Sequence, residues 1–292
     1  MKPTQPIAIA GTGRMAQALG RLLAEAGCPV VALGGRNLAH AQAAAEFVGT
    51  QPATLHELAR LASHWLIAVS DGAVAEVAEI LARAGARAGV ALHTSGVHGP
   101  EALAPLTEAG VACGALHPLQ TVTSPEQGRL ALRGAAFALT GSGPAADWAE
   151  EIARAAGGWL LRIPAHRRAA YHAAAVLASN CLVGLLDAAV MLMGSAGVTP
   201  AEALRALAPL ARASCQNALA AGPEAALTGP VRRGDAQTVA LHLRALSEWP
   251  ALDELYRACS LQLIALARRS GLPPERVAPI ERLLRGRNQD DA

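Results

Sequence analysis

The sequence predicts an α/β protein in which a doubly wound, mostly parallel sheet is followed by an all-helical C-terminal region. Short apolar runs alternate with helical patterns in the first half of the 292 residues, and a glycine-rich turn follows the first run. From Pro164 onward no convincing strand pattern appears. We therefore expect two domains, one over residues 1–164 and a helical one over residues 165–292.

The composition argues against several classes of protein. Apolar residues make up 52% of the chain, too many for a disordered protein, and the single lysine, Lys2, argues against lysine-dependent catalysis. The net charge is +2 with dispersed arginines, so we expect no nucleic-acid partner. The five cysteines never form a C-x-x-C pair, which fits neither a disulfide framework nor a metal site. We expect no metal and a reducing compartment, the cytoplasm.

An uncharged stretch at residues 169–186 is apolar enough to raise the question of membrane insertion. His172, Ser179 and Asn180 interrupt this stretch, and Asp187 follows it. Polar side chains are costly inside a bilayer, and the N-terminus lacks the long apolar core of a signal peptide. The pattern therefore favours a buried helix of a soluble protein, and we expect no membrane partner.

The first apolar run, residues 7–10, leads directly into a G-x-G-x-x-A turn, and a helical pattern and a second strand at residues 29–33 follow. A dinucleotide-binding fingerprint requires this context. Gly11 permits a tight turn, Gly13 lets the backbone approach a pyrophosphate, and the helix N-terminus supplies free N–H groups. The alternative is a glycine turn without a ligand. The predicted cofactor contacts in this turn are Gly11, Thr12, Gly13, Arg14, Met15 and Ala16.

The end of the second predicted strand indicates which dinucleotide binds. A site for NAD places an acidic residue about 20 residues past the glycines, on the ribose hydroxyls. Here no acid occurs between Glu25 and Glu46, and the strand leads instead into Arg36 and Asn37. A guanidinium can hold a 2′-phosphate through charge-assisted hydrogen bonds, whereas a carboxylate repels it. We expect NADP as the cofactor, with Arg36 on the phosphate and Asn37 as helper and helix cap.

Further strands follow in the same rhythm, with an antiparallel edge possible late in the sheet. We predict them at residues 65–69, 90–93, 111–116, 135–140 and 159–163. Ligands of such sheets lie at the carboxyl ends of the strands. Ser70, Ser95 and His117 follow or end predicted strands, so we expect Ser70 and Ser95 to contact the cofactor and His117 to lie beside them.

The second half is predicted to be helical throughout. A helix over residues 167–193 comes first, and a capping box at Thr199 and Glu202 starts the next one, which runs toward residue 221. Asp235 is the predicted cap of a third helix. A fourth helix spans residues 253–270, a short final helix follows, and the charged tail at residues 285–291 is expected to fray.

Two groups of polar residues in this half are candidates for substrate chemistry. Arg168, His172 and Ser179 share one stripe of the first helix, and Asn180 lies at its edge. Histidine suits proton donation near neutral pH. The alternative, equally open, is that His172 is a core residue whose ring nitrogens are hydrogen-bonded. The second group lies in the turn at residues 226–235. Its Thr228, Gly229 and Arg233 form either an anion pocket or a plain helix connection.

Four segments carry a resemblance to a known family: LHTSGVHGPEALAPL, GALHPLQT, YHAAAVLASN and ALTGPVRRGD. They resemble a bacterial family that joins a Rossmann-like domain to a C-terminal helical domain of unknown function, DUF2520. That family is similar in architecture to ketopantoate reductase, pyrroline-5-carboxylate reductase and F420-dependent NADP oxidoreductases. The resemblance implies a helical domain of the 6-phosphogluconate dehydrogenase C-terminal type, a nicotinamide reductase, and a homodimer formed through the helical domain.

The resemblance also implies roles for individual residues. His117 occupies the place of a loop beside the nicotinamide, and Thr228 and Gly229 match a substrate-holding turn of the pyrroline reductases. Ketopantoate reductases pair a helix lysine with asparagine, but here the helix has Asn180 and Arg168. Arginine is a poor proton donor, so the hypothesis is that His172 or His117 protonates the substrate. Asn180 would bond the developing charge, and Arg168 or Arg233 would hold a substrate carboxylate.

Three functions are therefore open. The first is an NADPH-dependent reductase of a small 2-oxo acid, with ketopantoate as the compound to test first. The second is an imine reductase of the pyrroline-5-carboxylate type. The third is a non-catalytic NADP-binding sensor or scaffold, which predicts nucleotide binding without turnover.

Overall fold

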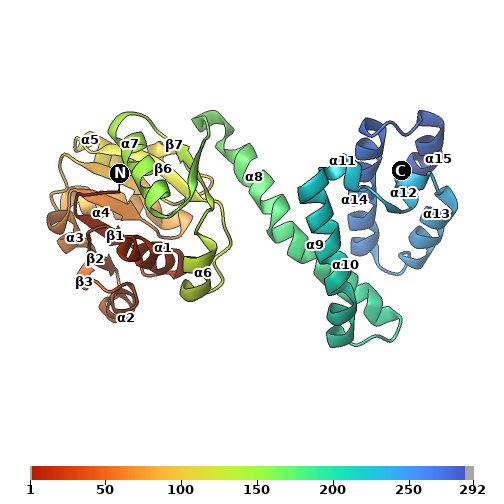
Figure 1. Ribbon diagram of the computed structural model, residues 1–292, viewed down its shortest axis with the longest axis horizontal. Coiled ribbons are helices and arrows are strands. Elements are labelled where there is room, and N and C mark those ends of the chain that lie inside the picture. Colours follow the sequence, from red (N-terminus) through yellow and green to blue (C-terminus); the bar gives the residue numbers. More distant parts are fainter. Residues whose placement is uncertain (1, 287–292) are drawn as a thin grey trace. The chain divides into compact units, whose positions relative to one another are not determined.

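The computed structural model describes residues 2–286 and confirms the predicted order of a sheet followed by helices (Figure 1). Within that range the chain forms an eight-stranded sheet in the order β3-β2-β1-β4-β5-β6-β7-β8. The strands are β1 (Ile7–Ala10), β2 (Val30–Gly35), β3 (Gln51–Thr54), β4 (His64–Ile67), β5 (Val90–His93), β6 (Ala112–Pro118), β7 (Ala136–Thr140) and β8 (Trp159–Arg162). Residues 287–291 of the tail that is predicted to fray lie outside the described residues.

The strand directions confirm a parallel sheet with a late antiparallel edge. Strands β1 to β6 pair in parallel, β7 runs antiparallel to β6, and β8 pairs in parallel with β7. The sequence did not predict β3, an edge strand of four residues that contains Pro52 and buries only Ala53. So short and exposed a strand has no apolar periodicity to detect.

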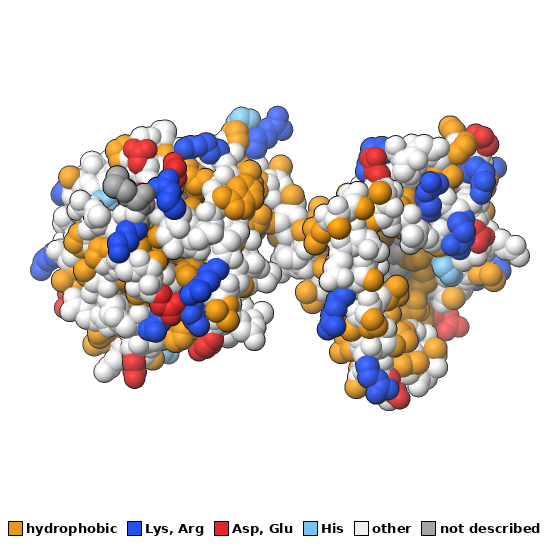
Figure 2. All heavy atoms as spheres, viewed as in Figure 1, with side chains coloured by type: hydrophobic (Ala, Val, Ile, Leu, Met, Phe, Trp, Pro, Cys, Tyr) orange, Lys and Arg blue, Asp and Glu red, His pale blue; other side chains and the backbone are white. Residues whose placement is uncertain are grey.

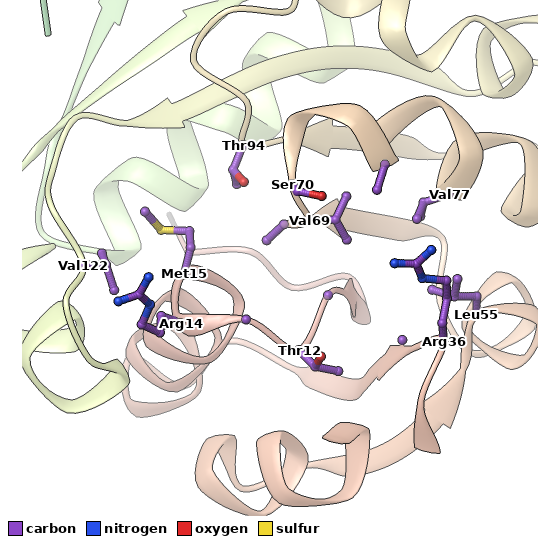
Figure 3. A pocket seen from close by; sticks show the side chains of 15 residues that line it. Thr12, Arg14, Met15, Arg36, Leu55, Val69, Ser70, Val77, Thr94 and Val122 are labelled. Carbon is purple, nitrogen blue, oxygen red and sulfur yellow. The ribbon is translucent and has the colours of Figure 1, made fainter. Parts of the chain in front are cut away.

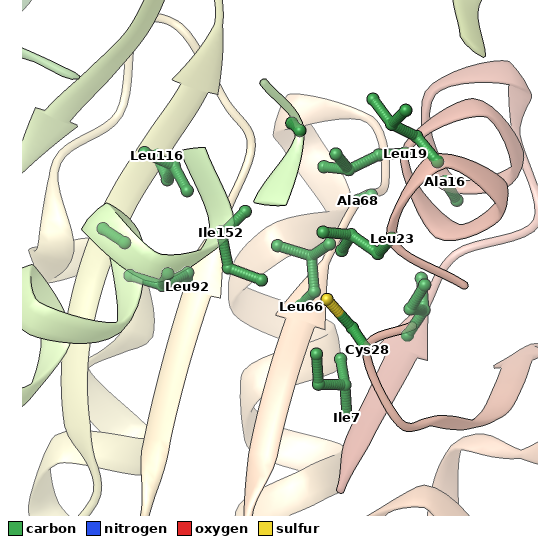
Figure 4. Close-up of a cluster of buried hydrophobic side chains, with 14 of the residues drawn as sticks. Ile7, Ala16, Leu19, Leu23, Cys28, Leu66, Ala68, Leu92, Leu116 and Ile152 are labelled. Atoms are coloured by element: carbon green, nitrogen blue, oxygen red, sulfur yellow. The ribbon is translucent and has the colours of Figure 1, made fainter. Parts of the chain in front are cut away.

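The helices of the sheet region cover its two faces, and each face has its own hydrophobic core. Along β1, Ile7 and Ile9 face one core, and Ala8 and Ala10 face the other, as the two-residue period of a strand requires. Figure 4 shows the first core, in which Leu19 and Leu23 pack against the sheet. The helices are α1 (Arg14–Glu25), α2 (Leu38–Val48), α3 (Leu55–Leu61), α4 (Val74–Arg83), α5 (Ala104–Glu108), α6 (Pro125–Ala131) and α7 (Gly143–Ala155), with the short 3₁₀ turns η1 (Asp71–Ala73), η2 (Pro100–Leu103) and η3 (Ala165–Arg167).

The predicted single helix over residues 167–193 is wrong in one respect, because the structure divides it into α8 (Arg168–Ala178) and α9 (Asn180–Ser195). The break lies at Ser179, whose backbone has φ −126° and ψ −76°. The Ser179 hydroxyl donates a hydrogen bond of 2.7 Å to the carbonyl of Ala175, four residues earlier. Serine in this position competes with the helical hydrogen bonds and often bends a helix.

Contacts between residues divide the chain into two compact units, with the division between Leu182 and Val183. The second unit contains the remaining helices, and the described part of it has no strand, as predicted. Thr199 and Glu202 form the predicted capping box, and Asp235 caps its helix by accepting from the Thr238 N–H. The helices are α10 (Pro200–Ala221), α11 (Pro223–Ala226), α12 (Gly229–Arg233), α13 (Ala236–Ala245), α14 (Pro250–Arg269) and α15 (Pro274–Arg285).

One helical stretch of the described chain, Ala165–Ser195, is long and apolar enough to cross a membrane, with a mean hydropathy of 2.0. The sequence predicted that this stretch is buried, but none of its most apolar window is buried within the chain. The small core of the second unit is built instead from α12 to α15, around Val239, Ile264 and Val277. Hydrophobic side chains are therefore exposed on this unit, as Figure 2 shows.

Candidate functional site

The glycine turn after β1 is held between two neighbouring strands. The Gly11 N–H donates to the Gly34 carbonyl at 2.7 Å, and the Ala68 N–H donates to the Ala10 carbonyl at 2.8 Å. Gly11 has φ +135°, and a Cβ on it would lie 2.1 Å from the Ala68 carbonyl oxygen. A side chain is excluded here both by conformation and by space. Glycine at position 11 therefore lets the backbone of the turn approach the backbone at Gly34 and Ala68.

The second glycine, Gly13, leaves room for a ligand at the N-terminus of α1. It is the N-cap of this twelve-residue helix and makes no side-chain cap, and no acidic residue lies in the first turn. No heavy atom comes within 4 Å of a Cβ built on Gly13. The N–H groups of the first turn, together with the helix dipole, are therefore free to bind an anion.

A cavity of about 560 Å³ opens over this turn (Figure 3). Arg14 and Arg36 lie at opposite ends of it, and Ser70 and Thr94 line the side away from Thr12. Of the predicted cofactor residues, the cavity is lined by Gly11, Thr12, Gly13, Arg14, Met15, Arg36 and Ser70. Two cationic side chains and a free helix N-terminus suit a ligand with phosphates at more than one position.

Three of the predicted cofactor residues do not line the cavity. Ala16 is fully buried against the sheet, and Asn37 caps α2 by accepting a 3.1 Å hydrogen bond from the His40 N–H. Ser95 is 3% exposed, and its neighbour Thr94 lines the cavity instead. A one-residue shift along an extended segment turns a side chain to the other side, which sequence position alone does not decide.

The two arginines of the cavity have different partners. The Arg14 Nη1 donates to the Thr123 carbonyl at 3.1 Å, which ties the loop before α6 to the start of α1. Arg36 lies 3.7 Å from Glu76, and both side chains are largely exposed. Exposed ion pairs of this kind contribute at most about 1 kcal/mol, so Arg36 is free to exchange Glu76 for a phosphate.

A second polar cluster surrounds Arg168, at the start of α8 in the first unit. Arg168 is only 2% exposed, yet among residues 2–286 no carboxylate lies within ion-pair distance of its guanidinium. Its Nη1 donates to the Thr140 hydroxyl at 3.0 Å and its Nη2 to the Ser95 carbonyl at 2.5 Å, while Nε is buried without a partner. A buried charge without a counterion is costly for stability and is typical of functional sites.

Two of the histidines near this charge are held in the neutral form. The Ser95 N–H donates to His93 Nδ1 at 3.2 Å, so His93 donates through Nε2 to the Gly99 carbonyl at 2.8 Å. Burial lowers the pKa of His93 to about 4. Burial also lowers the pKa of His117 to about 4, helped by the charges of His172 and Arg168, while Asp71 acts in the opposite direction.

His117, at the end of β6, lies against two residues of α8. Its Nδ1 is 2.7 Å from the Tyr171 hydroxyl, and its ring centroid is 5.7 Å from that of His172 in an edge-to-face arrangement. Burial raises the pKa of Tyr171 to about 12. A Cβ on Gly96 would lie 2.3 Å from His172 Nδ1 and 3.1 Å from His117 Nε2, so only glycine allows both rings this position.

The structure therefore brings Ser95, His117, Arg168 and His172 of the first unit into one cluster, whereas Thr228, Gly229 and Arg233 belong to the second unit. Asn180 is exposed beyond the break at Ser179, and its side-chain oxygen accepts from the Ser179 hydroxyl at 3.0 Å. In the second unit, Thr228 precedes α12, Gly229 has φ +85°, and Arg233 lies 4.0 Å from Asp235 with most of its side chain exposed. This turn is a capped connection between helices, and it leaves the Arg233 side chain accessible. Their roles stay predictions.

Sequence analysis missed three residues of the two sites. Thr94 follows a predicted strand, as Ser95 does, so its position at the strand end was a usable signal. Tyr171 precedes His172 and shares the face of α8 on which Arg168 lies, three residues earlier. Thr140 ends a predicted strand as well, but only the antiparallel pairing of β7 with β6 brings it to Arg168.

The two neutral histidines predict a loss of stability in acid. In the unfolded chain they take up protons near pH 6.5, whereas in the folded protein His93 and His117 do so only near pH 4. The unfolded state thus binds more protons between these values, and the free energy of unfolding falls as the pH drops from 6.5 to 4, by up to about 1.4 kcal/mol per pH unit for each histidine. Urea unfolding followed by circular dichroism across this range measures the slope. In His93→Gln the slope should decrease, and an unchanged slope would contradict the assignment.

Two family models match the chain, and the boundary between them lies earlier than the division into two units. The model of the Rossmann-like domain matches residues 2–118, and that of the domain of unknown function DUF2520 matches residues 135–263. No curated protein matches the chain by sequence. The second match begins just before β7, so it includes the reversed end of the sheet as well as helices α8 to α13.

Three solved structures are similar to this chain over most of its length. The first is a proposed NADP oxidoreductase from Bacteroides fragilis, with 22% identity and a TM-score of 0.70 over 90% of this chain and 98% of that one. The second is a protein from Thermotoga maritima, with 25% identity and a TM-score of 0.69 over 90% of this chain and 98% of that one. The third is a reductive aminase from Aspergillus terreus in complex with NADPH and ethyl-5-oxohexanoate, with 20% identity and a TM-score of 0.59 over 96% of this chain and 92% of that one. The likeness extends through both units of the fold. The chain thus joins a Rossmann-like domain to a C-terminal DUF2520 domain.

Proposed function

We propose that this protein is an NADP(H)-dependent oxidoreductase that reduces a C=O or C=N bond of a small molecule. The observation that carries the proposal is the cavity over the glycine turn, with Arg36 at one end and Thr94 in its wall. The residue after Thr94 bonds to Arg168, so the cavity and the buried polar cluster share the segment after β5. A nucleotide cavity next to perturbed titratable groups is typical of an active site.

The residues of the cavity fit an NADP nucleotide. Gly11, Gly13 and the free N–H groups of α1 would hold the pyrophosphate, and no side chain occupies the space next to Gly13. Arg36 would hold the 2′-phosphate, and no carboxylate other than Glu76 lies within ion-pair distance of it in the described chain. When bound, the nicotinamide nucleotide supplies a hydride to the substrate.

The chain's own residues would supply the proton and the charge. His117 or His172 would protonate the substrate oxygen or nitrogen, and Asn180 is our candidate for a hydrogen bond to the developing charge. Both Nη groups of Arg168 are already bonded to Thr140 and Ser95, so its present arrangement favours a fixed positive charge over a direct clamp. Thr228, Gly229 and the exposed Arg233 remain candidates for holding a substrate carboxylate.

Two substrate classes deserve a direct comparison. A small 2-oxo acid such as ketopantoate is one, with the exposed Arg233 as a candidate for holding its carboxylate. An imine of the pyrroline-5-carboxylate type is the second candidate, and the structural likeness to an NADPH-bound reductive aminase favours testing it in parallel. NADPH oxidation measured with both compounds separates the two.

Calorimetric titration of the purified protein with NADPH and NADH tests the proposed function. We expect NADPH to bind more tightly than NADH, because only NADPH carries the phosphate that Arg36 would neutralise. No binding of either nucleotide, oxidised or reduced, would overturn the oxidoreductase proposal. Binding without turnover on any carbonyl or imine would favour the third function, an NADP sensor or scaffold.

We also propose that the protein is a homodimer whose copies cover the exposed apolar helices of the second unit. None of the residues of α9 is buried within one chain, and the side chains of Val183 and Met191 are 69% and 48% exposed. Asp187 lies in the middle of this helix, which disfavours a membrane as the covering partner. Exposed apolar side chains gathered along one helix support an interface with another chain.

The dimer predicts that two negative charges per copy at this surface cause dissociation. We expect the wild-type protein to sediment as a dimer and Val183→Glu with Met191→Glu to sediment as a monomer, because both copies would bury unpaired carboxylates. Leu38→Glu, at a position 58% exposed in the first unit, is the control and should leave the dimer intact. A monomeric wild-type protein would contradict the proposal. A wild-type protein that binds liposomes would contradict both the proposal and our expectation of a cytoplasmic protein.

A further inference from the structure

His117 and Tyr171 are joined by a short hydrogen bond. Their atoms Nδ1 and Oη are 2.7 Å apart, and among residues 2–286 neither atom has another hydrogen-bond partner. The two residues lie on different elements, His117 on β6 and Tyr171 on α8, so the bond crosses from the sheet to the helix. The ring centroids are 5.8 Å apart at an angle of 80°.

The direction of this hydrogen bond follows from the protonation states. Burial keeps the pKa of Tyr171 near 12 and that of His117 near 4, so at neutral pH the phenol is protonated and the imidazole carries a single hydrogen. The hydroxyl has no acceptor in the described chain other than Nδ1, and donation to it satisfies both groups. The hydrogen of His117 is then on Nε2, which no described residue contacts through a hydrogen bond.

We propose that His117 and Tyr171 form a proton relay, in which His117 Nε2 passes its proton to the substrate and the Tyr171 hydroxyl replaces it at Nδ1. This inference rests on the proposed function and assigns Tyr171 as a positioning residue that acts through His117. The Nε2–H bond breaks as the new O–H or N–H bond of the substrate forms, and the Oη–H bond breaks as Nδ1–H forms. The electron pair of the reduction comes from the reduced nicotinamide nucleotide. A proton from water then binds at His117 Nε2 and the Nδ1 proton returns to the Tyr171 oxygen, which restores both residues.

Arg168 explains how the relay tolerates the negative charge that it creates. When Tyr171 gives up its proton, a phenolate remains in a half-buried position, where an isolated charge is costly. Arg168 lies three residues earlier on the same helix, and its positive charge acts to lower the pKa of Tyr171. Because this guanidinium has no carboxylate partner in the described chain, its charge is available to the phenolate. The relay therefore gives the buried arginine a function.

Nitrogen NMR of the histidine rings in the full-length protein tests the relay without a substrate. We expect His117 at pH 7 to be a single neutral tautomer with hydrogen on Nε2, and Tyr171→Phe to mix the two tautomers because Nδ1 loses its donor. Tyr256→Phe is the matched control. It breaks a similar pair in the second unit, where His242 Nδ1 lies 2.8 Å from the Tyr256 hydroxyl, and it should leave the His117 signals unchanged.

Turnover gives the second measurement, as NADPH oxidation with ketopantoate or pyrroline-5-carboxylate. Tyr171→Phe should lower kcat about 100-fold and change KM and the Kd of NADPH less than about threefold, because the proton is used only in the transition state. Hydrogen on His117 Nδ1 in the wild-type protein, or a kcat of Tyr171→Phe equal to that of Tyr256→Phe, would overturn the relay. A failure of NADPH to bind overturns the proposed function instead, and the NMR result then still decides the direction of the hydrogen bond.

Discussion

Replacing Arg36 with glutamate is expected to weaken NADPH binding about 100-fold and to leave NADH binding within about threefold of wild type. The guanidinium would hold the 2′-phosphate through charge-assisted hydrogen bonds, and a carboxylate in its place repels the phosphate. A loss of this size is about 2.7 kcal/mol, within the range of one or two such bonds. Calorimetric titration with both nucleotides measures the difference.

Glu76→Gln is the control for this experiment. It removes the neighbour that lies 3.7 Å from Arg36 without touching the arginine, and both side chains are exposed. NADPH affinity should stay equal or rise, since Arg36 no longer exchanges one anionic partner for another. Equal weakening of NADPH and NADH in Arg36→Glu would show that Arg36 supports the cavity in general, and the phosphate assignment would then be wrong.

Replacing His117 with glutamine is expected to lower kcat by about 100-fold or more, with NADPH binding retained. Glutamine keeps a hydrogen-bond donor of similar reach but cannot pass a proton to the substrate, so the change removes general acid catalysis. His117 does not line the nucleotide cavity, which is why the Kd of NADPH should change little. Steady-state NADPH oxidation with the accepted substrate measures kcat and KM separately.

His166→Gln is the matched control, because His166 is an exposed histidine in η3 outside the cluster. Its kcat should equal that of the wild-type protein. The companion variant His172→Gln separates the two candidate donors, since the His172 ring lies beside His117 but does not bond to Tyr171. A wild-type kcat in His117→Gln together with a loss in His172→Gln would assign the proton to His172.

The parts of the fold and site that were predictable are local in sequence. The turn predicted to contact the cofactor, from Gly11 to Met15, lines the cavity, because strand, turn and helix are encoded within about thirty consecutive residues. The capping box at Thr199 and Glu202 and the cap at Asp235 were predictable for the same reason, since each cap involves residues three positions apart. Arg36 also follows its strand directly into the cavity.

Predictions that depended on burial or on the direction of a side chain were less successful. The apolar stretch around α9 was expected to be buried, but it is exposed within this chain. Apolar composition indicates only that a helix packs against some apolar partner, and that partner need not belong to the same chain. Ser95 was chosen over Thr94 although only Thr94 lines the cavity. The polar stripe from Arg168 to Ser179 was predicted on the assumption of one continuous helix, but the helix is interrupted at Ser179.

The sequence by itself determined most of the order of strands and helices along the chain, and the glycine turn that leads into the N-terminus of α1. Each of these depends on neighbouring residues, so the chain's own periodicity and turn chemistry decide them. Only the tertiary structure decided that Arg168 is a buried charge without a carboxylate partner and that Tyr171 bonds to His117, 54 residues away in sequence. Such pairs form where β5, β6, β7 and α8 converge, and hydrogen-bond partners and desolvation depend on that convergence rather than on local propensity.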